Sequence, residues 1–191
     1  MTSLNPLLLI VVLLALTLTV SAILGLHIAR MISYELQPPE KPLARLERKL
    51  SKVLGLGEGR EMTWKEYFIA LLITNFLAGA LVFGVLFLQG MAFGKESFSI
   101  DLAFHTATSF ITNTDLQHYN GEELSSFSQM VGITYAMFVA PASGICAAFA
   151  FIRAFTRKNL GLGDFYIDFA LVILTLLLPI ALISSLLFIA F

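Results

Sequence analysis

Four long apolar runs alternate with shorter polar stretches along the whole chain. They cover Pro6–Ile28, Tyr67–Leu88, Ser126–Ile152 and Phe165–Phe191. Each is long enough for an α-helix to cross a hydrocarbon core about 30 Å thick, which takes roughly 20 residues. Charged residues make up only 13% of the chain, about half of what soluble domains carry. The pattern predicts an all-α integral membrane protein with four transmembrane helices.

The first run has the position of a signal peptide. However, no Lys or Arg precedes it, its apolar stretch is longer than a signal core, and no small-residue cleavage site follows. We therefore expect it to stay in the protein as a membrane anchor.

Basic residues are distributed unevenly between the loops. Most lie in the first inter-helix loop: Arg30, Lys41, Arg45, Arg48, Lys49, Lys52, Arg60 and Lys65. The last loop adds Arg153, Arg157 and Lys158, whereas the acidic segment from Gln89 to Ser125 holds Lys95 alone. Because Lys and Arg accumulate on the cytoplasmic side, we predict a multi-pass cell-membrane protein with its N-terminus outside. Loops 31–63 and 153–164 are then cytoplasmic.

The first loop contains an amphipathic pattern. After Pro38, Pro39 and Pro42, apolar residues recur at helical spacing (Leu43, Leu46, Leu50, Val53 and Leu54), and basic residues fall mostly on the other side. Two interpretations stay open: a helix at the headgroup level held by membrane lipid, and a docking surface for a cytoplasmic partner. Trp64 and Tyr67 are then expected at the membrane interface.

A shorter apolar segment, Ile100–Ile111, lies between the second and third runs. Twelve helical residues reach only about 18 Å, too short to cross a membrane. Ser99 or Asp101 can cap its start, and the polar run Thr112-Asn113-Thr114-Asp115 follows its end. This pattern is typical of a re-entrant pore helix with a filter loop. Its C-terminal dipole and the carbonyl groups of the loop favour a cation.

Other interpretations of the polar residues are weaker. The short segment could instead be a plain extracellular amphipathic helix. A metal site from Asp101, His105, Asp115 and His118 would have one helically spaced pair, and two ligands do not make a site. A hydrolase would need a nucleophile and a base within reach of each other, and the sequence shows no such pattern. Cys146, inside an apolar run, is expected to pack as a small residue, and Asp168 to lie at the membrane interface near Asp164.

The third run contains Ala140-Pro-Ala-Ser-Gly144 near its centre. Proline in a helix predicts a kink. Small residues predict a closely packed face, formed here by Gly132, Ala136, Ala140, Ser143, Gly144, Ala147 and Ala148. Helix packing and a gate or ion-path role remain equally compatible with this stretch.

At this point the motifs resemble a known family. They are Glu61–Tyr67, Asp101–Ala107, Ser109–Thr114, Gln117–Glu122, Ser128–Gly132, Ala142–Gly144 and Ile152–Arg157, in order over nearly the whole chain from about Leu46. They resemble the N-terminal part of the potassium-binding subunit of Kdp-type potassium-transporting P-type ATPases. Nothing in the sequence or its net charge of −1 suggests a nucleic-acid partner.

The resemblance implies a fold of helix–pore–helix repeats similar to potassium channels, with four repeats around one filter. It divides the chain into an N-terminal transmembrane helix (1–30), a basic cytoplasmic loop with an amphipathic helix (31–63), a first repeat (64–157) and the opening helix of a second (158–191). It places the potassium filter at Thr112, Asn113 and Thr114, with Asp115 and Gln117 at its outer mouth.

The same resemblance implies a non-catalytic subunit of an ATP-driven potassium importer. Such a subunit needs no cofactor, carries K⁺ as its transported ligand, and passes it to a P-type catalytic subunit within a complex that also has small accessory subunits.

The chain departs from this family in residues and in length. Asp115 and Leu116 stand where the family usually has Asn and Trp, and Pro141 where it usually has Ala. Family members are several-fold longer, so one filter segment is present where a ring needs several. We expect one of three situations: a second polypeptide supplies the remaining repeats, the chain is an inactive truncated fragment, or copies assemble as a homotetrameric cation channel.

Overall fold

The computed structural model describes residues 6–33, 38, 40–56, 61–92, 94–156 and 161–190. Over these ranges the chain is helical and forms no strand. Four helices are long and apolar enough to cross a membrane: Pro6–Ile32, Trp64–Met91, Ser128–Thr156 and Phe165–Ala190. They agree with the four predicted runs to within a few residues at each described end. The all-α integral membrane fold is therefore confirmed.

The elements follow one another in a simple order. The α-helices are α1 (Pro6–Ile32), α2 (Pro42–Val53), α3 (Trp64–Ala92), α4 (Ile100–Ile111), α5 (Tyr135–Thr156), α6 (Phe165–Val172) and α7 (Leu178–Ala190). A 3₁₀ turn, η2 (Gly121–Glu123), and a π-helical segment, η3 (Ser128–Thr134), precede α5. A second π-helical segment, η4 (Ile173–Leu177), joins α6 to α7.

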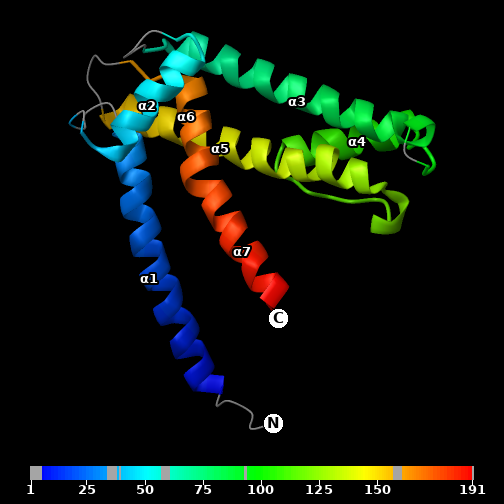
Figure 1. Ribbon diagram of the computed structural model, residues 1–191, viewed down its shortest axis with the longest axis horizontal. Coiled ribbons are helices and arrows are strands. Elements are labelled where there is room, and N and C mark those ends of the chain that lie inside the picture. The colour runs from blue at the N-terminus through cyan, green and yellow to red at the C-terminus, as the bar shows by residue number, and fades with distance from the viewer. Residues whose placement is uncertain are drawn as a thin grey trace.

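Two groups of helices extend from a common corner (Figure 1). In one group, α3, α4 and α5 contact one another. In the other, α1 and the continuous α6–η4–α7 rod run away from the first group. The end of α1, α2, and the starts of α3 and α6 meet the end of α5 at this corner. The ends that adjoin the two basic loops therefore lie together.

Backbone pairing also joins the segments that precede α3 and α6. The Met62 amide donates to the Gly163 carbonyl at 2.9 Å, and the Leu162 amide donates to the Met62 carbonyl at 3.2 Å. The ends of the two basic loops that precede α3 and α6 are thus held side by side, as the charge pattern requires if both loops face the same side of the membrane.

Helix α1 buries almost none of its apolar surface inside the protein. Met31 is its one buried residue in the described structure, while Leu7, Leu16 and Leu26 are at least 60% exposed. An apolar helix bare of protein is stable only where lipid or another membrane chain covers it. Helix α1 is therefore attached to the rest of the protein through its C-terminal end alone.

Helix α2 confirms the amphipathic pattern and places its leucines. Leu43, Leu46 and Leu50 pack against the core cluster at the corner, and α2 contacts α6. Gly55, with φ +66°, provides the left-handed residue that ends the helix. Val53 is 82% exposed and Leu54 48% exposed. The leucine side thus faces the protein, and the two residues at the end of the predicted stripe do not.

Candidate ion-binding site

Helix α4 starts with the predicted cap. The Ser99 hydroxyl accepts a hydrogen bond from the Leu102 amide at 3.4 Å, so Ser99 is the N-cap and Asp101 lies in the first turn. The hydrogen bond from Ser99 and those from the backbone amides of Asp101 and Leu102 lower the pKa of the Asp101 carboxyl. A carboxylate here is favoured by the positive end of the helix dipole.

Helix α4 ends at the middle of the two neighbouring membrane-spanning helices. The Ile111 Cγ1 atom lies 3.6 Å from the position that a Cβ would take on Gly79, near the midpoint of α3. One face of α4 is buried against α3 and α5, through Ala103, Thr106, Ala107, Ser109 and Phe110. A helix that enters from one end of the bundle and stops half-way has the arrangement of a re-entrant helix, not of an extracellular segment lying on the surface.

The chain then turns back on itself in the 112–116 loop. The Thr112 amide donates to the Thr108 carbonyl at 3.0 Å, and the Asn113 amide to the Phe110 carbonyl at 3.3 Å. The amides of Thr114 and Asp115 both donate to the Ser109 carbonyl, at 2.9 and 3.2 Å. These bonds satisfy four amide groups with the carbonyl groups at the end of α4.

The same arrangement leaves the loop carbonyl groups available. Among the described residues, the carbonyl oxygens of Thr112, Asn113 and Thr114 accept no hydrogen bond. Asn113 (φ 56°) and Asp115 (φ 53°) adopt the left-handed conformation, which Asn and Asp tolerate better than most residues. Such strained backbone commonly occurs at ligand-binding positions. The loop thus offers a row of carbonyl groups that have no partner within the described ranges.

Ser109 holds the returning chain at Leu116, and the sequence analysis gave this residue no role. Its hydroxyl accepts from the Leu116 amide at 2.7 Å and donates to the Leu116 carbonyl at 3.1 Å. Ser109 is 6% exposed. The available signal was a small hydroxyl residue two positions before the end of a short helix. A hydroxyl at that point can bond to the returning chain, which makes Ser109 a positioning residue.

The side chains of the predicted filter residues lie as follows. The Thr112 hydroxyl donates to the Thr108 carbonyl at 2.8 Å and lies 3.1 Å from the Thr114 hydroxyl. The Asn113 amide nitrogen lies 3.7 Å from the place of a Cβ on Gly144 of α5. Asp115 and Gln117 are exposed, like the rest of the loop. The residues predicted for the filter and its mouth therefore stay together on one short loop.

The imagined metal site finds no support in the described part of the chain. His105 and His118 are in edge-on contact, with ring centroids 4.7 Å apart. No group of three or more His, Cys, Asp or Glu side chains comes together among the described residues.

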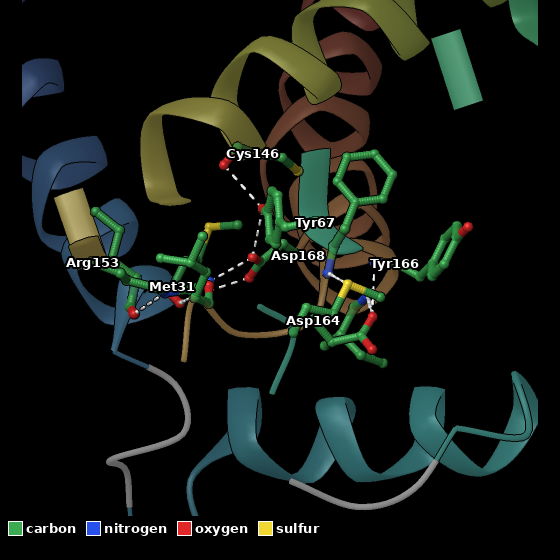
Figure 2. Close-up of polar contacts among 12 residues, drawn as sticks. Met31, Tyr67, Cys146, Arg153, Asp164, Tyr166 and Asp168 are labelled. Carbon is green, nitrogen blue, oxygen red and sulfur yellow. Dashed lines mark hydrogen bonds and ion pairs between the residues drawn. The ribbon is translucent and has the colours of Figure 1, made fainter. Parts of the chain in front are cut away.

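A second polar site lies at the corner, far along α5 from the loop. Arg153 and Asp168 form a two-pronged ion pair, with Nη1–Oδ2 and Nη2–Oδ1 distances of 2.5 and 2.9 Å. Both are at most 1% exposed. The Tyr67 hydroxyl lies 2.9 Å from Asp168 Oδ2 and 3.0 Å from the Cys146 carbonyl oxygen (Figure 2). We call these three side chains the Arg153 cluster.

The Arg153 cluster joins helices through backbone groups as well. Arg153 Nε donates to the Ile32 carbonyl at the end of α1 at 3.0 Å, and Nη1 donates to the Leu162 carbonyl at 2.8 Å. It therefore ties α1, α3, α5 and α6 together at the point where they converge. Removing one partner of such a buried ion pair strongly destabilises the folded protein, because the other charge is left buried without compensation.

Two predictions for this region are wrong. Asp168 is not an interface residue, because it is buried and paired with Arg153. Tyr67 is 2% exposed and points into the protein, whereas Trp64 is 65% exposed. Asp164 instead caps α6, accepting from the amides of Tyr166 at 2.9 Å and Ile167 at 3.3 Å. Cys146 is buried, as predicted.

The small-residue face of α5 is confirmed only in part. Ala136, Ala140 and Ser143 are buried, but Gly144, Ala147 and Ala148 are exposed. The helix continues through Pro141 to Thr156 as one element. The departure from α-geometry lies earlier, in η3, where Gly132 approaches Val85 of α3. The sequence did not predict this π-helical segment.

Comparison with known proteins extends the structural result. The model of the family described as potassium-transporting ATPase A subunit (KdpA) matches residues 11–191. Among curated relatives, proteins named potassium-transporting ATPase potassium-binding subunit match most of the chain. The one from Hydrogenobaculum sp. (strain Y04AAS1) is 43% identical over 173 residues, which are 87% of this chain and 30% of the relative.

Two more relatives with the same name match similar shares of this chain and of their own length. The protein from Salmonella arizonae is 43% identical over 172 residues (87% of this chain, 30% of the relative). That from Caldanaerobacter subterraneus subsp. tengcongensis is 35% identical over 168 residues (85% and 30%). The chain thus spans about 30% of the length of these relatives. Since the family match extends over nearly all of the chain and agrees with its membrane fold and its motifs, the chain belongs to the potassium-transporting ATPase A subunit family.

Proposed function

We propose that this chain binds extracellular K⁺ at the 112–116 loop and passes it toward a P-type catalytic subunit. The observation that carries this proposal is the row of carbonyl groups at Thr112, Asn113 and Thr114, which have no partner in the described residues. Carbonyl oxygens can replace the hydration shell of K⁺. The end of α4 adds partial negative charge at mid-height of α3.

Each residue of the loop then has a distinct role. The carbonyl groups of Thr112, Asn113 and Thr114 bind the ion, and Ser109 holds the returning strand at Leu116. Asp115 and Gln117 lie on the exposed side, at the outer mouth. An exposed carboxylate there raises the local concentration of cations. No step of ATP hydrolysis is assigned to this chain, which we propose acts as a non-catalytic subunit.

One loop supplies only part of the cage that a dehydrated ion needs. We propose that further helix–pore–helix repeats, supplied by a second polypeptide, complete the ring around the exposed face of the loop. The relatives support the need for further repeats, because this chain matches about 30% of their length and the rest of that length can hold such repeats. The P-type catalytic subunit and small accessory subunits of a Kdp complex are the other proposed partners.

The proposed orientation puts the N-terminus outside and loops 31–63 and 153–164 in the cytoplasm. It is supported by the meeting of the corresponding helix ends at one corner (Figure 1). Because Cys146, the single cysteine, is buried, single cysteines at Lys95 and Lys49 can be labelled in cells with a membrane-impermeant maleimide. We expect labelling of Lys95→Cys from outside and labelling of Lys49→Cys only after the cells are opened. The reverse result contradicts the orientation.

The function is tested by co-purification and by ATP hydrolysis. The tagged chain is expressed with the neighbouring reading frames, and we expect a P-type catalytic subunit to co-purify and to hydrolyse ATP faster when K⁺ is added. Retention of the stimulation in a Thr112→Pro/Thr114→Pro variant that still assembles contradicts a role for the loop. Potassium conductance by the chain alone in liposomes would instead indicate a homotetrameric channel.

A further inference from the structure

A cavity of about 670 Å³ lies where the end of α1 meets the start of α2. Among the described residues, its wall is formed by three separate segments: α1 and the turn after it, the first turns of α2, and η4. The residues that matter for its chemistry are His27, Arg30, Lys41, Leu43, Leu46 and Thr175. We call it the α1–α2 cavity. Its lining residues belong to the end of α1 and the start of α2, and these helix ends lie at the corner in Figure 1.

Two basic side chains lie on the rim of the α1–α2 cavity. Arg30 and Lys41 line it, both with exposed side chains, and no acidic side chain among the described residues contributes to its wall. The start of α2 forms part of the same wall. Lys41 makes no side-chain capping bond there and Pro42 occupies the first turn. The positive end of the α2 dipole therefore adds to the attraction for an anion.

The inner wall is apolar. Leu43 and Leu46 lie one turn apart on α2 and line the cavity beside the charged rim. At the floor, His27 Nε2 and Thr175 Oγ1 lie 3.1 Å apart and hydrogen-bond to each other. The two polar side chains at the floor therefore satisfy each other's hydrogen bonding. Thr175 is ten residues into the fourth membrane-spanning helix, so the cavity extends from the basic loop toward membrane depth.

This combination selects between possible anions. A soluble phosphate needs the charged rim but gains nothing from an apolar wall. A phospholipid needs both, because its phosphate lies at the level of the basic side chains and its hydrocarbon begins just below. Basic pockets between membrane helices on the cytoplasmic side suit anionic headgroups.

We propose that the α1–α2 cavity binds the headgroup of an anionic phospholipid, with the phosphate at Arg30 and Lys41 and the upper acyl chain along Leu43 and Leu46. The lipid would fill the angle between α1 and α2 and fix the otherwise bare α1 against the corner. The proposal goes beyond potassium binding. It depends on the cytoplasmic placement of this corner and not on the filter loop.

The test uses the full chain purified in mild detergent, with bound lipids counted by native mass spectrometry. Phosphatidylglycerol is compared with phosphatidylcholine of the same acyl chains. We expect the anionic lipid to bind about tenfold more tightly, and the Arg30→Gln/Lys41→Gln variant to lose this preference. The matched control is Lys49→Gln/Lys52→Gln, which removes equal charge from α2 outside the cavity and should keep the preference.

A single substitution keeps the test decisive if the double variant misfolds. Lys41→Gln changes one exposed side chain with no capping bond, and should lose part of the preference while keeping the melting temperature measured in phosphatidylcholine. Equal binding of the two lipids by the unmodified chain overturns the proposal. So does an equal loss in the Lys49→Gln/Lys52→Gln control, which would indicate diffuse attraction. If millimolar inorganic phosphate raises the melting temperature as much as phosphatidylglycerol does, the cavity is a soluble-anion site instead.

Discussion

The 112–116 loop and the Arg153 cluster are both polar sites in an apolar helical protein. They differ in how many of their polar groups have hydrogen-bond partners. In the Arg153 cluster, the guanidinium and carboxylate groups pair with each other and with Tyr67 and nearby carbonyl groups. In the loop, the amides are satisfied, whereas the carbonyl oxygens of residues 112–114 accept no hydrogen bond from any part of the chain that the structure describes. Because unsatisfied polar groups are costly at membrane depth, the first site is complete in itself and the second is suited to a ligand.

The largest expected effect comes from breaking the complete site. Asp168→Ala leaves the Arg153 charge buried without its partner, and should lower the free energy of unfolding by about 3–5 kcal/mol. Denaturant titration of the purified chain in detergent micelles measures this. Asp115→Asn is the control, since that carboxylate is exposed and Asn also tolerates the left-handed backbone at this position, and its stability should be nearly unchanged. A loss below about 1 kcal/mol for Asp168→Ala would show that the cluster does not hold the corner together.

Removing one hydrogen-bonding group from the same cluster should cost less. Tyr67→Phe keeps the ring but removes the hydroxyl that bonds to Asp168 and contacts the Cys146 carbonyl. A hydrogen bond to a charged group contributes about 1.5–3 kcal/mol, and the melting temperature should fall accordingly. Tyr166→Phe is the control, because Tyr166 is 39% exposed and lies apart from the cluster in Figure 2. Equal losses in the two variants would contradict a specific role for Tyr67.

The loop should respond differently, in affinity more than in stability. Ser109→Ala removes both bonds that hold Leu116, so the carbonyl groups lose their spacing. We expect K⁺ affinity of the assembled complex to fall about tenfold, while the unfolding free energy changes by about 1–2 kcal/mol.

The control for this variant lies one turn earlier on the same helix. Thr106→Val removes a buried hydroxyl that has no partner in the described structure, and should leave both affinity and stability unchanged or slightly improved. If Thr106→Val lowers K⁺ affinity as much as Ser109→Ala, the effect belongs to α4 packing and not to the loop clamp.

The smallest expected effect is electrostatic. Asp115→Asn removes an exposed negative charge from the proposed mouth, and K⁺ affinity should fall a few-fold at low ionic strength. The difference should vanish near 1 M of an inert salt, where screening extends over about 3 Å. Titration of K⁺-stimulated ATP hydrolysis at several salt concentrations measures this. An affinity that does not change at any salt concentration rules out a role for this carboxylate in concentrating cations.

The success and failure of the sequence-based predictions follow the same division. The four spans, the short α4 and its Ser99 cap were predictable, because each depends on composition or on neighbours within one turn. Asp168 was misplaced, because its partner Arg153 lies 15 residues away on another helix. Tyr67 was misplaced for a similar reason: an aromatic residue at the start of a span has the same sequence signal whether it faces lipid headgroups or protein.

The loop illustrates the boundary between the two kinds of information. Its residues could be singled out because a polar run between apolar segments is unusual at membrane depth. The Ser109 clamp could not be inferred, since it depends on the chain returning to α4 after Thr112, which no local pattern specifies. The π-helical segment η3 was also missed, because its residues have no composition that separates it from the α-helix that follows.

The sequence by itself determined that this is a four-span membrane protein of a potassium-transporting ATPase family, with one polar loop after a short helix. Apolar length, charge distribution and motif order are local properties that the chain carries whatever its fold. Only the tertiary structure decided which polar groups find partners. Burial of Asp168 depends on α5 and α6 converging with α1 and α3, and the free carbonyl groups of the loop depend on amides that turn back to α4. Hydrogen bonds act over about 3 Å, so residues distant in sequence count only once the helices have packed.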